Sequence, residues 1–208
     1  MLTVTHQTMN PTTTSPLATR PMRADARRNH QRVLEAAREL FAEQGIEAQI
    51  DDIAHRAKVG VGTVYRHFPT KEDLLEALAE QRFEWLAERA REALAEEDGW
   101  SAFCGFLRDA VARQATDVAL GEAMGSRPEM VNAVAQRAGM LELLQELVSR
   151  AQAEGKLRDD VTGADVPMIF CGLGGVAKAG SVLEFMRWDR LLELIIDGLA
   201  APQPSKLP

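Results

Sequence analysis

The sequence predicts an all-α protein, and three observations support this fold class. Residues that favour helices (Leu, Ala, Glu, Arg and Gln) dominate, and the 208 residues include a single tyrosine. No stretch alternates apolar and polar residues in the way that a half-buried strand requires. The composition, with 46% hydrophobic and 26% charged residues, is that of a globular protein that buries a core.

The first two helices are predicted from the apolar residues on either side of Gly45. Four apolar residues share one face of the first helix: Val33, Ala37, Leu40 and Phe41. We expect this helix to end at Gly45, because a glycine commonly follows the last helical residue. A short second helix carries a compact apolar face made of Ile50, Ile53, Ala54 and Ala57.

A third helix is predicted from Val61 to Phe68, after a tight connection at Val59–Gly60. Pro69 ends it, since the residue before a proline is disfavoured in the helical region. The segment 70–73 forms a predicted capping box that opens a long fourth helix, which runs toward Leu94. Three short helices with a glycine-containing turn between the second and third predict a helix-turn-helix.

Beyond Leu94 the sequence predicts a body made of further helices. The pattern breaks at Gly99, and helices are expected at 100–117, 128–154, 165–183 and 189–200. The start of the chain has Thr, Pro and Ser without an apolar core behind a positive cluster, so it predicts a disordered tail and not a secretory signal. The expected organisation is a tail at 1–22, a helix-turn-helix unit at 23–71, a helical domain at 72–201 and a frayed end at 202–208.

Charge is distributed unevenly along the chain. The net charge is −7, yet the segment from Arg20 to Lys71 holds ten Lys/Arg against seven Asp/Glu, a local balance of +3 that leaves −10 for the rest. Three of the four histidines (His30, His55 and His67) lie in the same segment. A basic end on an acidic body fits a protein that contacts phosphates at one end only.

Other features of the sequence exclude several classes of site. Cys104 and Cys171 are far apart and match no metal-ligand spacing, so we expect two reduced thiols, no metal and no cofactor. No apolar run approaches the ~18 residues of a membrane span. We therefore expect no membrane partner and a cytoplasmic location. The run Gly172-x-Gly174-x-x-Ala177 matches a dinucleotide-binding turn only superficially, because its surroundings are helical and lack a preceding strand.

The third helix has the residues that a DNA-reading helix needs. Val64 and Phe68, spaced i and i+4, can pack inward, which leaves Gly62, Thr63, Arg66 and His67 at or near the exposed side. Gly62 removes a side chain where the backbone must come close to a phosphate or a base. The hydroxyls of Thr63 and Tyr65 can donate to phosphates, and Arg66 can reach phosphates or base edges.

The same region closely resembles the tetracycline-repressor (TetR) family. The resemblance covers about 50 residues in unbroken register and rests on the following runs: Phe41 to Gly45, Asp52-Ile53-Ala54, Gly62 to Phe68, and Lys71 to Leu75. It implies a dimer whose two third helices enter successive major grooves, and a C-terminal domain that binds a small molecule and thereby releases the DNA. It also implies phosphate contacts from Thr63, Tyr65 and Lys71 and base contacts from the third helix.

The full set of expected DNA-binding residues is Gln49, Gly60, Val61, Gly62, Thr63, Tyr65, Arg66, His67 and Lys71. Two of them depart from the family pattern. Gln49 stands where the family often has a threonine that caps the second helix and contacts a phosphate, and Gly60 stands where it often has a serine. These departures put individual contacts in doubt and leave the motif intact.

Each of these residues also has a purely structural interpretation. Tyr65 and Phe68 can be core aromatics, His67 can be a packing residue in place of a base reader, and Arg66 can be an ordinary solvated arginine. The cluster Arg23, Arg27, Arg28 and Arg32 fits two interpretations equally. It is either a solvated helix face or a group that contacts the DNA backbone or minor groove.

The body offers candidates for a dimer interface and for an effector pocket. The last two helices are the expected dimer contact, because small residues allow close approach and an apolar stripe follows them. The interface candidates are Gly172, Gly175, Leu191, Leu192, Ile195 and Leu199. A pocket for a largely hydrophobic effector is expected between helices at 83–180. Its candidate lining residues, which also fit a plain core, are Phe83, Trp100, Phe103, Phe106, Met124, Met140 and Phe170.

Two other classes of protein compete with this interpretation. A helical enzyme is disfavoured, because the sequence has no paired metal ligands, phosphate loop or Ser/His/Asp arrangement. A sensor whose helix-turn-helix has lost its function is disfavoured by the presence of Thr63, Tyr65, Arg66 and Lys71. The sequence thus predicts a non-enzymatic regulator that binds a palindromic operator on double-stranded DNA as a homodimer. A repressor released by a small-molecule effector is the expectation, and an activator remains the alternative.

Overall fold

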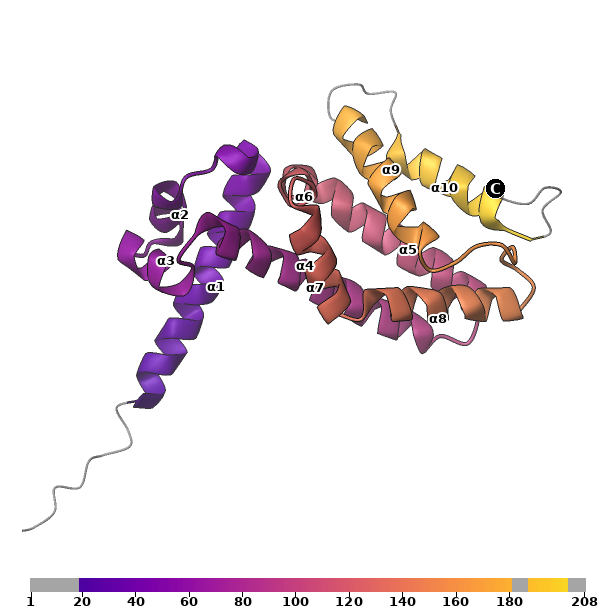
Figure 1. Ribbon diagram of the computed structural model, residues 1–208, viewed down its shortest axis with the longest axis horizontal. Coiled ribbons are helices and arrows are strands. Elements are labelled where there is room, and N and C mark those ends of the chain that lie inside the picture. The colour runs from indigo at the N-terminus through magenta and orange to yellow at the C-terminus, as the bar shows by residue number, and fades with distance from the viewer. Residues whose placement is uncertain (1–18, 181–186, 202–208) are drawn as a thin grey trace, which may run out of the picture.

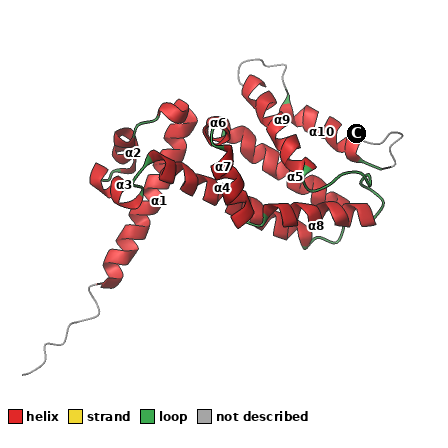
Figure 2. Ribbon diagram, in the orientation of Figure 1, coloured by secondary structure: helices red, strands yellow, loops and turns green. Residues whose placement is uncertain are grey.

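The computed structural model describes residues 19–180 and 187–201, and the side chains of 25–177 and 187–201 within them. The described residues form ten α-helices and one 3₁₀ turn, and no named strand occurs among them (Figure 2). A single antiparallel bridge joins Leu157 to Ala200. None of the described helices is both long enough and apolar enough to span a membrane. The all-α prediction is confirmed.

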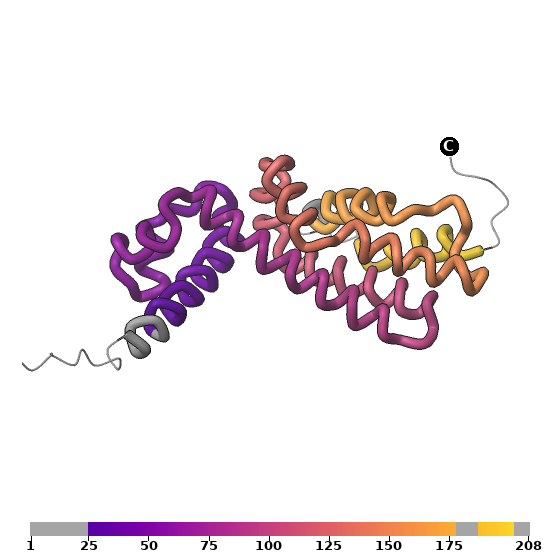
Figure 3. The backbone as a smooth tube through the Cα atoms, turned by 60° about the horizontal axis from the view of Figure 1, so that its bottom comes forward, coloured from indigo at the N-terminus to yellow at the C-terminus, as the bar shows by residue number. Residues whose placement is uncertain are grey.

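The helices divide into two lobes that share one helix, α4 (Lys71–Leu94) (Figures 1 and 3). The first lobe, which we call the head, contains α1 (Thr19–Gln44), η2 (Gly45–Glu47), α2 (Ile50–Ala57), α3 (Val61–His67) and the first half of α4. The second lobe, the body, contains the rest of α4 and the helices that follow. These are α5 (Gly99–Thr116), α6 (Val118–Gly125), α7 (Pro128–Arg137), α8 (Met140–Ala153), α9 (Asp165–Gly180) and α10 (Trp188–Leu199).

Each lobe has a hydrophobic core of its own, and α4 contributes to both. Leu74, Leu75 and Leu78 belong to the head core, whereas Leu86 and Ala90, further along the same helix, belong to the body core. Two body helices also enter the head core, through the following buried residues: Leu120, Ala123 and Met124 of α6 and Val134 of α7. α6 packs against both α1 and η2. The head and body are therefore joined by α4 and by a second contact through α6.

The ends of the head helices form as the sequence predicts. Gly45 takes a positive φ of 61° directly after α1. At the start of α4 the capping box is complete, because the amide of Asp73 donates to Thr70 Oγ1 (3.1 Å) and the amide of Thr70 donates to Asp73 Oδ2 (2.9 Å). α1 begins at Thr19, within the tail expected at 1–22 and ahead of the expected boundary at residue 23. Residues 1–18 of that tail and the expected frayed end at 202–208 lie outside the described residues.

Two expectations for the body are wrong. The helix expected at 128–154 is two helices, α7 and α8, because Gly139 takes a positive φ of 66° that a continuing helix cannot accommodate. The helix α6 was not expected at all. It has only eight residues, two of them glycines, so its own propensity is low and it is stabilised by burial against the head. Residues 181–183 of the helix expected at 165–183 lie outside the described residues.

Candidate nucleic-acid interface

The turn between α2 and α3 is fixed from outside by an arginine of α1. Lys58 ends α2 in the left-handed conformation (φ 54°). The guanidinium of Arg32 donates to the carbonyl oxygens of Ala57 and of Lys58, the latter at 3.0 Å. Arg32 thus caps the C-terminus of α2, a role that the sequence does not reveal. Arg32 is itself exposed, so the capping contact adds a structural role, and DNA contact by the arginine cluster stays a prediction.

α2 is also tied to α1 by an exposed ion-pair network. Arg56 donates to Glu43 through both terminal nitrogens (3.0 Å each) and to Glu39 at 3.0 Å. The hydrogen bond from Arg56 lowers the pKa of the Glu43 carboxyl from its usual value. Because these side chains are solvent-exposed, the ion pairs contribute little to the free energy of unfolding. Their main effect is to orient α2 against α1.

The inner face of α3 is anchored by Val64 and Phe68, as predicted. Their exposed fractions are 0% and 3%, respectively. The ring of Phe68 packs 4.8 Å from the ring of His30, centroid to centroid, and His67 lies 5.5 Å from the same His30 ring. Burial, and then the neighbouring His67, lower the pKa of His30. His67 is half-buried in this cluster, so its packing role is observed.

The outer face of α3 carries side chains without an internal partner. Tyr65 is 49% exposed, which rules out the interpretation as a core aromatic, and Arg66 is exposed beside it. Within the described part of the chain, neither side chain has a hydrogen bond or ion pair. α3 contains no Asp or Glu, and Arg66 and His67 are in its last turn. The outer face therefore presents donors and positive charge.

The glycines at the start of α3 are not required by the packing of the protein. A Cβ atom at Gly62 would meet nothing within 4 Å, and one at Gly60 would meet only Thr63 Oγ1, at 4.0 Å. Both residues are exposed. Open space in front of these two glycines, which flank Val61, allows an external molecule to approach the backbone closely. A serine at position 60 would also fit, so the departure at Gly60 removes a hydroxyl without changing the turn.

Gln49 lies directly before α2 and Lys71 is the first residue of α4, and both already make internal contacts. Gln49 precedes α2 without capping it, because its side-chain amide donates to the carbonyl of Glu47 at 2.6 Å. The ammonium of Lys71 donates to the carbonyl of Ile46 and lies 5.8 Å from the ring centroid of Phe41. An ammonium has three donors, so the Ile46 contact leaves Lys71 able to bind a phosphate as well.

In the body, the predicted pocket residues lie mostly in close-packed core. Phe103 and Phe106 are fully buried. Trp100 stacks on Phe103 at a centroid distance of 6.1 Å, and Phe170 packs at a tilt against Phe106 at 6.2 Å. Met140 belongs to the body core, Phe83 packs against both cores, and Met124 belongs to the head core. Met124 thus lies where body and head meet.

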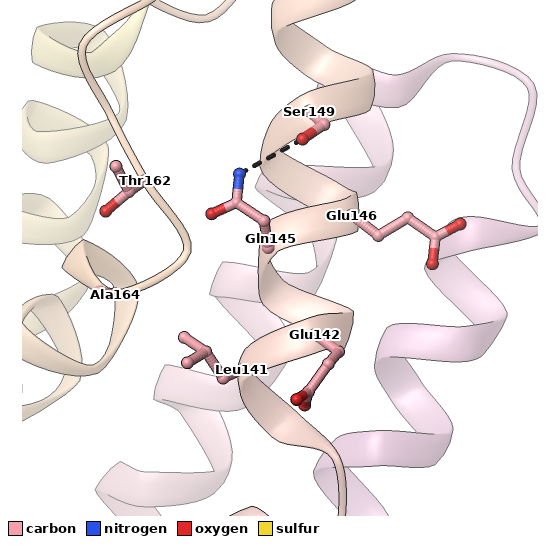
Figure 4. A pocket seen from close by; sticks show the side chains of 7 residues that line it. All are labelled: Leu141, Glu142, Gln145, Glu146, Ser149, Thr162 and Ala164. Atoms are coloured by element: carbon pink, nitrogen blue, oxygen red, sulfur yellow. Dashed lines mark hydrogen bonds between the residues drawn. The ribbon is translucent and has the colours of Figure 1, made fainter.

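Two grooves are found on the surface of the body, and neither is lined by the predicted pocket residues. One, of about 650 Å³, lies between α8 and the segment at 162–164, and polar side chains dominate it (Figure 4). Gln145 and Ser149 form a 3.3 Å hydrogen bond along it. The other groove, of about 410 Å³, is apolar and lies along α9 and α10.

The apolar groove contains most of the predicted dimer residues. Its lining includes Gly172, Leu191, Ile195 and Leu199, and Gly175 is exposed on the same helix α9. Leu192 differs, because it is 2% exposed and belongs to the core of its own protomer. On α10 it lies about 100° around the helix from Leu191, on the side that packs into the body core.

Comparison with known proteins covers both lobes. Residues 33–78 match the family model described as bacterial regulatory proteins, tetR family. Residues 98–201 match the C-terminal domain of SbtR-like transcriptional regulators. An HTH-type transcriptional regulator of Staphylococcus aureus strain USA300 is 48% identical over 54 residues, which are 26% of this chain and 29% of that protein. The match to that relative is thus limited to less than a third of its length.

Solved structures match nearly the whole chain. A TetR transcription regulatory protein from Mycobacterium vanbaalenii is 38% identical, with a TM-score of 0.63, over 87% of this chain and 100% of that chain. A TetR transcriptional regulator from Streptomyces coelicolor is 28% identical, with a TM-score of 0.58, over 82% of this chain and 97% of that chain. The similarity therefore extends through head and body together.

Proposed function

This chain belongs to the TetR family of DNA-binding transcriptional regulators, and on that premise we propose that it is a repressor that binds a palindromic operator as a homodimer and is released by a small-molecule effector. The observation that carries the proposal is the outer face of α3. Its inner residues fix the helix in the head, while Tyr65 and Arg66 point outward without internal partners. Side chains of this kind on a short helix fit the major groove of DNA.

Each residue of the interface has a role that its position supports. Arg66 can form two parallel hydrogen bonds with a guanine edge. The hydroxyls of Thr63 and Tyr65, the ammonium of Lys71 and the side chain of Gln49 can bind phosphates of the DNA backbone. Gly60, Val61 and Gly62 let the start of α3 come close to the DNA. His67 faces His30, so we assign it a supporting role.

The homodimer is supported by the apolar surface along α9 and α10. The side chains of Met168 and Leu194 are 63% and 58% exposed. Large apolar side chains that gather on the surface favour contact with another protein surface. A second copy of the same two helices would close a four-helix bundle. The two α3 helices of such a dimer would read half-sites about 34–36 Å apart, one turn of DNA.

Release by an effector is supported by the way in which head and body are joined. α4 spans both cores, and α6 packs against α1 and η2. A ligand that favours another arrangement of α6 and α4 would change the orientation of the head and the spacing of the two α3 helices. Since coupling between sites is reciprocal, operator DNA should weaken effector binding by the same factor.

The proposal is tested by selecting bound fragments from a pool of random DNA, followed by fluorescence anisotropy on the selected sequence. We expect a palindrome, and affinity that falls steeply with salt. Arg66→Ala should cost about 1–3 kcal/mol per protomer and relax the preference for the correct base. Arg91→Ala, an exposed arginine on α4 far from α3, is the control for net charge and should leave the affinity unchanged. Wild-type binding with no preference over random DNA would contradict the proposal.

A further inference from the structure

Two arginines and one aspartate come together where α4, α5 and α6 meet. Arg113 of α5 lies with its Nε 3.5 Å from Asp117 Oδ2, and its guanidinium is 5.2 Å from the ring centroid of Trp85 on α4. Arg82 lies one turn before Trp85 on α4. It reaches the first turns of α6, where a Cβ atom at Gly121 would lie 3.7 Å from Arg82 Nη1.

Arg82 is a half-buried charged group beside the start of α6. Within the described part of the chain, no hydrogen bond or ion pair holds its guanidinium. Burial lowers the pKa of Arg82 below its usual value, Asp117 opposes this effect, and Arg113 adds to it. The cluster thus contains two positive groups and one negative group. Because Asp117 already pairs with Arg113, the guanidinium of Arg82 remains able to bind an anion.

The start of α6 adds to this positive potential. Asp117 is the residue before α6, and its side chain makes no capping hydrogen bond to that helix. The carboxylate turns toward Arg113 instead. The first amides of a helix carry partial positive charge and bind anions readily. Here the helix end and the two guanidinium groups belong to the same junction, and the aromatic face of Trp85 borders it.

We propose that Arg82, Arg113 and Asp117 form a binding site for a small organic anion, a carboxylate or phosphate on an apolar or aromatic body, and that this anion is the effector. A guanidinium binds both groups through two parallel hydrogen bonds. The ring of Trp85 supplies an apolar surface beside the charged head. The site itself is independent of DNA binding, but its regulatory role rests on the proposed function.

The position of the cluster gives binding a direct effect on the junction between body and head. Arg82 approaches α6 at Gly121, and Ala123 and Met124, two and three residues further along α6, are buried in the head core. An anion that draws Arg82 and Arg113 together would act on α6 and on the adjacent α4. Both helices join the two lobes, so the site is placed to alter the orientation of the head.

The site is tested with two probes, benzoate and phenyl phosphate. Benzamide, the uncharged analogue of benzoate, is the control. Tryptophan fluorescence reports binding, and Trp85→Phe assigns the signal to Trp85 among the three tryptophans. We expect saturable changes with benzoate or phenyl phosphate and none with benzamide. The probe that binds more tightly shows whether the site prefers a carboxylate or a phosphate. Equal responses to benzamide and benzoate, or no response to either anion, would overturn the inference.

Variants separate a binding role from a structural one. Arg82→Met and Arg113→Met should each weaken anion binding at least about tenfold, the loss of one charge-assisted pair. Arg91→Met is the matched control, because it removes the same charge from the same helix α4. The melting temperature of Arg82→Met without ligand should stay equal or rise, since a desolvated charge is removed. A fall in melting temperature with anion binding unchanged would overturn the inference, because Arg82 would then serve packing alone.

A last experiment measures operator affinity with and without the probes, and it distinguishes a failure of this inference from a failure of the proposed function. Benzoate or phenyl phosphate should lower the affinity for the selected operator in the wild type and not in Arg82→Met. Sequence-specific DNA binding by a protein that binds neither probe would overturn the anion site and leave the repressor proposal intact. Arg82-dependent anion binding without any operator preference would support the site and contradict the repressor.

Discussion

The head and the body share one helix and similar cores, but they expose different surfaces. On the head, the exposed Tyr65 and Val61 lie on α3 next to Arg66, and this helix has no acidic residue. On the body, the exposed Met168 lines an apolar groove, and the exposed Leu194 lies on α10, one of the two helices that form this groove. The difference indicates that the head is built to meet a charged polar polymer and the body to meet another protein surface. One continuous helix, α4, connects the two lobes that carry these surfaces.

The largest expected effect tests whether the two cores are separate. Phe41 and Phe103 are both fully buried, one in each core, and replacing either with alanine should cost about 3–5 kcal/mol of the free energy of unfolding. We expect Phe41→Ala to lose DNA binding while the dimer persists, and Phe103→Ala to lose both. Circular dichroism melts and sedimentation velocity measure the two properties. Dissociation of the dimer in Phe41→Ala would show that the cores are not separable.

A second prediction concerns the apolar surface of the body. Met168→Glu or Leu194→Glu should place charges in the dimer interface and weaken self-association at least about a hundredfold, equivalent to about 2.7 kcal/mol. Because both side chains are exposed in the protomer, the fold should be unaffected. Leu141→Glu is the matched control, since Leu141 is 56% exposed but lies on α8, at the other groove. Equal dissociation by all three variants, seen in sedimentation equilibrium, would remove the assignment to α9 and α10.

A smaller effect on stability is expected at the residues with positive φ where helices end in the body and in the head. Gly139 and Lys58 both have a positive φ, of 66° and 54°. Gly139→Ala should destabilise the protein by about 1 kcal/mol, because a side chain disfavours the left-handed region. Lys58→Gly should stabilise it by a similar amount, since the bonds from Arg32 go to backbone oxygens and are kept. Urea unfolding measures both, and a loss of stability in Lys58→Gly would contradict this account of the turn.

The smallest effect is a pH dependence limited to the head. Burial and His67 lower the pKa of His30, so the folded head favours the neutral ring. This contribution is complete above the unfolded pKa of about 6.5 and is lost as the pH falls below it toward the folded value. Thermal melts between pH 8 and pH 5 should show a decline in wild type that His30→Gln reduces. An identical decline in His30→Gln would assign the effect to other groups.

The head could be predicted from the sequence nearly residue by residue, whereas the body could not. Gly45, Pro69 and the Thr70–Asp73 box act locally, so their effects can be read from short segments. The inward and outward faces of α3 follow from helical spacing alone. The role of Arg32 was missed because it caps a helix end 25 residues away, and no local pattern marks such a contact.

In the body, the unpredicted features depend on tertiary contacts. α6 is too short to form alone and is stabilised by the burial of Leu120 and Met124 against the head. Leu192 was grouped with Leu191 as an interface residue, yet it faces the protomer's own core. The Arg82 cluster unites residues from three helices, and their proximity depends on the packing of those helices. Such features require the structure.

The most direct test of the central claim, that the body joins two copies whose heads read one operator, changes the DNA and leaves the protein intact. Anisotropy should compare the selected operator with the same DNA carrying about five extra base pairs at its centre, which turn one half-site to the opposite side of the duplex. We predict that this insertion lowers the affinity to that of a single half-site. An insertion of about ten base pairs should restore part of the affinity. Unchanged affinity after the five-base-pair insertion would contradict a dimer that holds two α3 helices at a fixed spacing.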